Sequence, residues 1–150
     1  LTDDNIEAVH EKENAYVELK KHPDYLKIRD LCDLKTSLYF ENEMGGYEPK
    51  SRYQDIVWST LKGDEKEWEE TKNRQFMNIA REIRDERIFF HWELEVPEIF
   101  YENGTHKKSE AGFDVIIGNP PYIRQELFKD LKPYHFVNYK AANNIADIYT

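Results

Sequence analysis

The sequence predicts a mixed α/β chain, with a helical part over about residues 1–88 and part of a parallel sheet over about residues 89–150. The first part is rich in charge and carries apolar residues at three- and four-residue spacing, which is typical of amphipathic helices. The second part holds four of the six prolines and many aromatic residues. The run from Phe113 to Gly118 is short, apolar and β-branched, as in the buried strands of parallel sheets.

Composition excludes several classes of protein. The length of 150 residues fits one domain, and the net charge of −9 argues against a basic module that binds nucleic acid by bulk charge. A hydrophobic content of 39% and an aromatic content of 14% are sufficient for a core and exclude a disordered chain. Because no apolar run reaches the roughly 18–20 residues of a membrane span, no membrane partner is expected.

The single cysteine and the two ends of the sequence carry further expectations. Cys32 stands alone, which excludes an internal disulfide and favours the reducing cytoplasm. The polar, acidic start from Leu1 to Asp4 is unlike a signal peptide. Since the sequence opens with leucine and ends on the uncapped apolar stretch 145–150, we expect a piece of a longer protein.

Four helices are expected in the first part. They run over about 4–21, from near Pro23 to Gly45, from Ser51 to Gly63, and from Asp64 through Ile83. Proline is tolerated in a first turn, glycine ends helices, and residues 51–54 match a capping box. The expected buried positions are Ile6, Val9, Tyr16 and Leu19; Tyr25, Ile28, Leu31, Cys32 and Leu38; Tyr53, Ile56, Val57 and Leu61; and Trp68, Phe76, Ile79 and Ile83. The charged residues are expected on the solvated faces of these helices.

The second part alternates short apolar runs with polar loops. Residues 89–96 are aromatic and partly alternating, which predicts a strand that Pro97 ends. A polar loop over 102–112 and a buried strand over 113–118 follow. Residues 125–131 are expected to form a short helix that Pro133 closes, and residues 141–150 begin another helix.

The sequence Asn119-Pro120-Pro121-Tyr122, at the carboxyl end of the predicted buried strand, is the feature that carries chemistry. Open α/β sheets bind ligands at such strand ends. An amine conjugated to a ring is a poor nucleophile, and two acceptors on its hydrogens would hold it and favour a tetrahedral nitrogen. The Asn119 side-chain carbonyl and the Pro120 backbone carbonyl are suited to that task.

The neighbouring residues fit the same interpretation. The two prolines stiffen the loop, and Tyr122 offers a flat face for a planar group, with stacking worth roughly 1–3 kcal/mol per base. Gly118 permits a close backbone approach to a ligand. A base in a duplex reaches such a pocket only when it is flipped out. The alternative is a Pro-Pro turn after a strand, with a tyrosine in the core.

Residues 113–123, Phe-Asp-Val-Ile-Ile-Gly-Asn-Pro-Pro-Tyr-Ile, resemble motif IV of the amino-group methyltransferases that use S-adenosylmethionine. They are most similar to the adenine-N6 DNA methyltransferases of combined restriction–modification enzymes, the type IIG or Eco57I-like group. Residues 90–100 resemble the stretch that these proteins carry before motif IV, and residues 144–149 resemble the start of the helix after it. Residues 1–87 carry no assigned motif and are interpreted as a helical insertion.

The resemblance implies part of a doubly wound, S-adenosylmethionine-dependent methyltransferase sheet over residues 89–150. It implies that Asn119 and Pro120 hold the target amine and that Tyr122 stacks on the flipped adenine. Gly118, Pro121 and Ile123 would complete the substrate-binding loop. The implied cofactor is S-adenosylmethionine, and Mg²⁺ is implied only where a nuclease domain is present elsewhere in the protein.

The glycines of this sequence, at 45, 46, 63, 104, 112 and 118, do not form the family's glycine-rich cofactor loop. The acidic residue that holds the cofactor's ribose in this family also has no counterpart here. We therefore expect the cofactor residues to precede Leu1, and the chain alone to be inactive. Duplex DNA is the expected partner of the whole protein. Exposed strand edges also predict self-association of the isolated chain.

Two rival functions and two weaker patterns remain open. The same loop would hold a protein glutamine or an RNA amine, and the helical part could be an interaction module on an idle methyltransferase remnant. Pro23-Asp24 with Asp33-Leu34-Lys35 matches the text of a PD…DxK nuclease, but helical spacing makes coincidence the better interpretation. No histidine or cysteine spacing indicates a metal site. Lys107 and Lys108 are more simply solvated loop residues than phosphate ligands.

Overall fold

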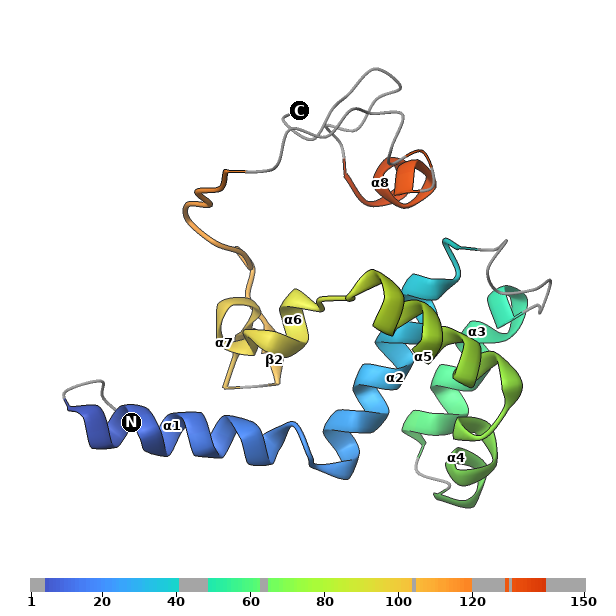
Figure 1. Cartoon of the computed structure of the whole chain (residues 1–150), viewed down its shortest axis with the longest axis horizontal. Helices are drawn as coiled ribbons and strands as arrows, with labels where there is room; N and C mark the ends of the chain where they lie inside the picture. The colour runs from blue at the N-terminus through green and yellow to red at the C-terminus, as the bar shows by residue number, and fades with distance from the viewer. Residues whose placement is uncertain are drawn as a thin grey trace. The chain divides into compact units, whose positions relative to one another are not determined.

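The computed structural model describes residues 5–40, 49–62, 65–103, 105–119, 129 and 131–139. The chain divides into two units (Figure 1). The helical unit comprises residues 1–37 and 47–89, and the second unit comprises residues 38–46 and 90–150. No helix in the described part of the chain is long and apolar enough to cross a membrane. The assignment of the two parts to an insertion and a methyltransferase domain stays a prediction.

Five helices are described in the helical unit. They are α1 (Ile6–Leu19), α2 (Pro23–Ser37), α3 (Pro49–Leu61), α4 (Glu65–Lys72) and α5 (Gln75–Arg87). Helix α1 starts where Asn5 caps it, since the Asn5 side chain accepts a hydrogen bond from the Ala8 amide at 2.7 Å. The predicted buried face of α1 is wrong, because no residue of this helix is buried and Ile6 is 78% exposed.

The core of the helical unit lies where α2 packs on α5, which crosses it in Figure 1. Leu34 and Met77 are fully buried there, and neither was among the predicted core residues. Of the predicted residues, the buried ones are Tyr25, Leu31, Ile56, Trp68 and Ile83, whereas Ile28 and Leu61 are exposed. Apolar periodicity therefore finds the helices and part of each buried face from α2 to α5, but it wrongly assigns a buried face to α1.

Three helix boundaries differ from the prediction. Helix α2 ends at Ser37 rather than at Gly45, where the Ser37 hydroxyl donates to the Leu34 carbonyl at 2.8 Å, a local bond that competes with a continuing helix. Helix α3 begins at Pro49 rather than after Ser51, because proline is preorganised for the first helical turn. The helix expected from residue 64 onwards is two helices, α4 and α5, separated at Asn73 and Arg74. The Asn73 side chain donates to the Glu69 carbonyl at 2.7 Å, and Arg74 adopts an extended conformation, with ψ of 151°, that ends one helix and starts the next.

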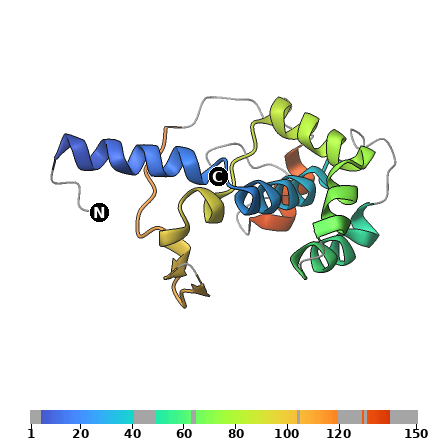
Figure 2. The same cartoon turned by 90° about the horizontal axis from the view of Figure 1, so that it is seen from below.

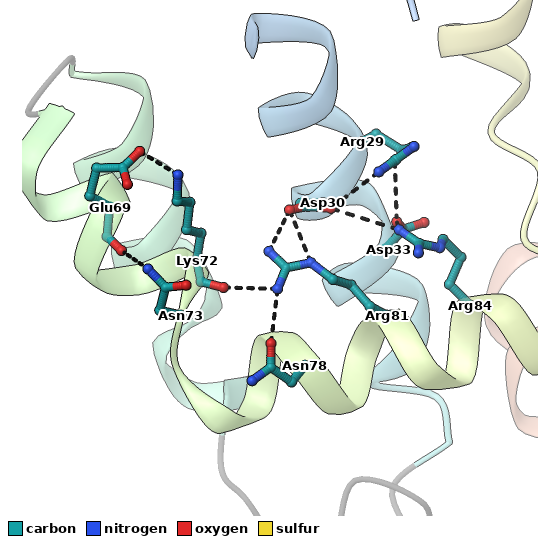
Figure 3. A network of polar contacts seen from close by, with 9 residues as sticks. All are labelled: Arg29, Asp30, Asp33, Glu69, Lys72, Asn73, Asn78, Arg81 and Arg84. Carbon is teal, nitrogen blue, oxygen red and sulfur yellow. Dashed lines mark hydrogen bonds and ion pairs between the residues drawn. The ribbon is translucent and has the colours of Figure 1, made fainter. Parts of the chain in front are cut away.

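A cluster of charged side chains lies between α2 and α5, as Figure 3 shows. Arg81 donates to the Asp30 carboxylate at 2.6 Å, and Arg84 donates to Asp33 at 3.1 Å. Asp33 is 1% exposed, so the expectation that charged residues occupy only solvated helix faces is wrong here. We call Arg29, Asp30, Asp33, Arg81 and Arg84 the buried charge cluster.

Helix α5 ends in an unusual way for its sequence. Ile88 follows it with φ of 55° and ψ of 63°, a left-handed conformation that glycine normally supplies at helix ends. Its amide donates to the Arg84 carbonyl at 2.7 Å and thereby closes the last turn. The Ile88 side chain is 83% exposed, so no packing compensates for the conformation.

The predicted strand over residues 89–96 is wrong. Of those residues, 92–95 form the short helix α6 (Trp92–Glu95), and a second short helix, α7 (Pro97–Phe100), follows it (Figure 1). The amides of Leu94 and Glu95 both donate to the His91 carbonyl at 2.9 Å. Pro97, expected to end a strand, instead occupies the first turn of α7. Partial alternation was a weak strand signal, and local helical hydrogen bonds prevail.

A small hairpin follows α7. Strand β1 (Tyr101–Glu102) pairs in antiparallel fashion with β2 (His106–Lys107), and the two strands are the short arrows of Figure 2. In this register Tyr101 is opposite Lys107. Asn103 turns the chain with φ of 50°, a conformation that asparagine adopts more readily than most residues. The predicted polar loop over 102–112 therefore contains three of the four strand residues of this hairpin.

The rest of the second unit carries one more described helix, α8 (Lys132–Asn138). Pro133 lies in its first turn, so the expectation that this proline closes a helix is wrong. The expected helix over 125–131 falls mostly outside the described residues, and the one over 141–150 falls wholly outside them. The described residues are mostly helical with one two-stranded sheet, and they do not show a doubly wound sheet.

Candidate functional site

The predicted site lies at the end of the segment 113–119. Gly118 and Asn119 are both described and both exposed, with no regular secondary structure. The predicted strand over 113–118 is not formed in the described part of the chain, because a buried parallel strand needs neighbours at its edges and β1 and β2 pair only with each other. Pro120, Pro121, Tyr122 and Ile123 lie outside the described residues. The roles of these site residues therefore stay predictions.

The segment is open to solvent along its length. Val115, Ile116 and Ile117 are 71%, 78% and 92% exposed. A side chain added at Gly118 would meet no atom of the described residues within 4 Å. Apolar residues on both faces of a segment are typical of a strand that other elements cover on both sides. The described residues provide no such cover for 115–117, so they do not form a complete binding site around Asn119.

The start of the segment, in contrast, is held by aromatic rings. Gly112 has φ of +146°, which turns the chain in a way that only glycine adopts easily. The Phe113 ring then lies edge-to-face against Trp92, with centroids 5.3 Å apart, and against Phe100, at 6.0 Å. Phe90 extends the group by an edge-to-face contact with Trp92 at 4.8 Å. We call Phe90, Trp92, Phe100 and Phe113 the aromatic group.

Polar contacts tie the hairpin to the short helices beside the aromatic group. The Glu93 carboxylate accepts hydrogen bonds from the Tyr101 hydroxyl and, at 2.6 Å, from the Lys107 ammonium. The hydrogen bond that Lys107 donates to Glu93 raises the pKa of Lys107 above its ordinary value. Lys108 donates its backbone amide to the Phe100 carbonyl at 2.9 Å and its side chain to the Glu98 carbonyl at 2.7 Å. Both lysines thus have partners within the protein, so neither is simply a solvated loop residue.

Sequence reasoning missed this arrangement for an identifiable reason. Residues 89–96 were interpreted as a strand, and strand geometry does not suggest that Trp92 contacts a phenylalanine 21 positions later. The aromatic residues at 90, 92, 100 and 113 were a usable signal, because edge-to-face pairs form among such clusters. Their partners could not be assigned without the helical turns of α6 and α7.

No metal site is present among the described residues, where no group of three or more His, Cys, Asp or Glu side chains is arranged to hold an ion. The PD…DxK pattern lies on α2. Asp24 and Asp33 are nine positions apart on this helix, which is about 14 Å along the axis and too far for one metal ion. Asp33 instead pairs with Arg84, and the Asp24 side chain is 81% exposed.

Comparison with known protein families decides the identity of the chain. The Eco57I restriction-modification methylase family matches residues 8–150, nearly the whole sequence. The chain belongs to this family. No curated protein and no solved structure matches it.

Membership in this methylase family confirms the resemblance predicted from residues 113–123. The match also includes the helical residues from position 8 onwards, to which the motif-based resemblance assigned nothing. The family match thus extends over both units of the chain. It indicates a restriction-modification methyltransferase as the general function.

Proposed function

We propose that this methylase chain carries the amine-binding part of a DNA methyltransferase that transfers a methyl group from S-adenosylmethionine to adenine N6. The single observation that carries the proposal is the family match over residues 8–150, which includes Asn119 and the loop that follows it. The same match favours DNA over protein glutamine or RNA as the substrate, because restriction-modification systems act on DNA.

Asn119 has the chemistry that this reaction requires. Its side-chain carbonyl accepts one hydrogen of the target amine, and the Pro120 carbonyl accepts the other. Withdrawing both hydrogens from the plane of the base localises the nitrogen lone pair for attack. Tyr122 stacks on the flipped base and keeps it in place, and Gly118, Pro121 and Ile123 complete the loop. The protein's contribution is positioning and electrostatics, with no covalent intermediate.

S-adenosylmethionine supplies the methyl group in the proposed reaction. The described residues do not fit a pocket for it, since neither Gly112 nor Gly118 stands in a strand–Gly-x-Gly–helix arrangement and a side chain added at Gly118 would meet no described atom within 4 Å. We therefore assign no described residue to the cofactor. We also infer that an endonuclease accompanies the methyltransferase in the same protein, with any Mg²⁺ held by residues other than those described.

The test is methyl transfer by the full-length gene product, with labelled S-adenosylmethionine and unmethylated duplex DNA. We expect label in N6-methyladenine, and a loss of about 100-fold or more in kcat for Asn119→Ala, the scale for removing one preorganised hydrogen-bonding group. Asn138→Ala, which removes an exposed amide on α8, serves as the matched control and should retain activity.

Other outcomes would replace the proposal. Label on RNA or on a protein glutamine, with none on DNA, would establish the rival amino-group substrate. Absence of cofactor binding by the full-length protein would establish a non-catalytic remnant. Full activity of Asn119→Ala would refute the role of that side chain while leaving the reaction intact.

A further inference from the structure

The apolar segment that leads to Asn119 lacks a strong register signal of its own. In a half-buried strand, alternating polar and apolar residues fix the register, because a slip of one residue turns every side chain to the wrong face. Val115, Ile116 and Ile117 are apolar on both faces, so a one-residue slip exchanges one β-branched residue for another. In a sheet that the segment joins as a strand, such a slip would nevertheless move Asn119 by one position, about 3.3 Å.

The structure places a distinctive contact at the start of this segment. Phe113 is the residue where ring packing on Trp92 and Phe100 ends and the exposed run begins. Its neighbour Asp114 is acidic and exposed, and could not replace a ring in that position. A slip of one residue would therefore remove Phe113 from both partners and bring a carboxylate against them.

The two rings that hold Phe113 are themselves fixed by local structure. Trp92 begins α6, and Phe100 ends α7, so both occupy short helical turns. The hairpin is bonded to the same turns, through the Lys108 amide to the Phe100 carbonyl and through Lys107 to Glu93. The positive φ of Gly112 then directs the chain into the contact.

We propose that Phe113, held between Trp92 and Phe100, sets the register of the segment that presents Asn119, and that Phe113 and Trp92 are positioning residues for methyl transfer. This inference rests on the proposed function of Asn119 and adds residues to which the resemblance to motif IV assigned no role. Neither ring touches the substrate. Their effect is to place the Asn119 carbonyl at the target amine.

The test uses single-turnover and steady-state methyl transfer by the full-length gene product. Phe113→Leu and Trp92→Leu should lower kcat about 10- to 100-fold, as expected for misplacement of a reacting group by an ångström or more, with KM for DNA and cofactor unchanged. Phe113→Tyr keeps the ring and should restore kcat to near the original value. Phe136→Leu, the same change at a phenylalanine of comparable exposure on α8, is the matched control.

A second variant separates register from simple loss of packing. Exchanging residues 113 and 114, so that the chain reads Asp-Phe instead of Phe-Asp, keeps composition and moves the ring by one position. It should lower kcat further than Phe113→Leu, because the ring now fixes the wrong register. Equal or higher kcat in the exchange variant would refute the register role, as would a rise in KM with kcat unchanged in Phe113→Leu.

A spectroscopic measurement keeps the contact testable apart from the reaction. The chain contains three tryptophans, which 5-fluorotryptophan labelling resolves by ¹⁹F NMR. Phe113→Leu should shift the Trp92 signal and leave those of Trp58 and Trp68 in place. An unmoved Trp92 signal would overturn the inference even if methyl transfer is observed. A different result is that Phe113→Leu shifts the Trp92 signal but the unaltered protein transfers no methyl group. That result would establish the ring contact and overturn the proposed function, together with the positioning role that rests on it.

Discussion

Replacing Arg81 with methionine tests whether the buried charge cluster stabilises the helical unit. Arg81 lies on α5 and connects three elements, since it donates to Asp30 on α2 at 2.6 Å, to the Lys72 carbonyl at the end of α4 at 2.9 Å, and to Asn78 at 3.0 Å. Methionine retains the apolar stem of the side chain and removes every donor. The change therefore isolates the charge and its hydrogen bonds from the packing of the stem.

The expected loss lies between two limits. Removing one partner of a buried ion pair costs about 3–5 kcal/mol, whereas an exposed pair contributes about 0–1 kcal/mol. The side chains of Asp30 and Arg81 are 9% and 28% exposed, and Asp30 retains the guanidinium groups of Arg29 and Arg84, each at 3.8 Å. We therefore expect Arg81→Met to lower the free energy of unfolding by about 2–3 kcal/mol, below the fully buried limit.

Urea denaturation followed by far-ultraviolet circular dichroism measures this loss. A double-mutant cycle with Asp30→Asn should give a coupling energy of at least about 1 kcal/mol, because the neutral amide no longer needs a cation. Asn78→Ala removes only an exposed acceptor of Arg81 and should change stability by less than about 0.5 kcal/mol. A loss below about 0.5 kcal/mol for Arg81→Met, or a coupling energy near zero, would refute the reasoning and restore the interpretation of these charges as solvated.

Two further predictions follow from backbone and ring geometry. Ile88→Gly should stabilise the helical unit by about 0.5–1 kcal/mol in the same denaturation assay, because it relieves the positive φ of an exposed β-branched residue. Ile88→Ala is the control, since alanine keeps the strained φ, and an equal gain in stability from alanine would contradict this cause. Burial, followed by the hydrogen bond with Tyr139, raises the pKa of Tyr134 to about 12, so its contribution to stability is present below pH 10 and is lost as the pH rises through 12. Absorbance titration at 295 nm should lack this component in Tyr134→Phe; an unchanged titration would exclude the assignment.

The fold was predictable where signals are local. Pro23 and the three- and four-residue spacing of apolar residues place α2, and Asn119 follows an apolar run whose pattern alone indicates the family. Contacts between distant residues were not predictable in this way. Arg81 meets Asp30 across 51 positions, and no periodicity separates a charged residue that faces a neighbouring helix from one that faces water.

The candidate site shows the same division. Its chemistry can be inferred from Asn119 and the prolines after it, because each residue type has a local task. The surroundings of the segment depend on Trp92 and Phe100, whose positions follow from short helical turns where alternation had suggested a strand. A strand is also a property of its neighbours, so an apolar run such as 113–118 does not by itself determine pairing.

The buried charge cluster has a consequence for how the helical unit responds to heat. The hydration of ions becomes less favourable as temperature rises, so burying Asp30 and Asp33 costs less in warm water than in cold. The hydrophobic contribution of Leu34 and Met77 reaches a plateau over the same range. The electrostatic share of the free energy that holds α2 to α5 therefore grows on warming. Salt should lower the free energy of unfolding of this unit more near its melting temperature than near 0 °C.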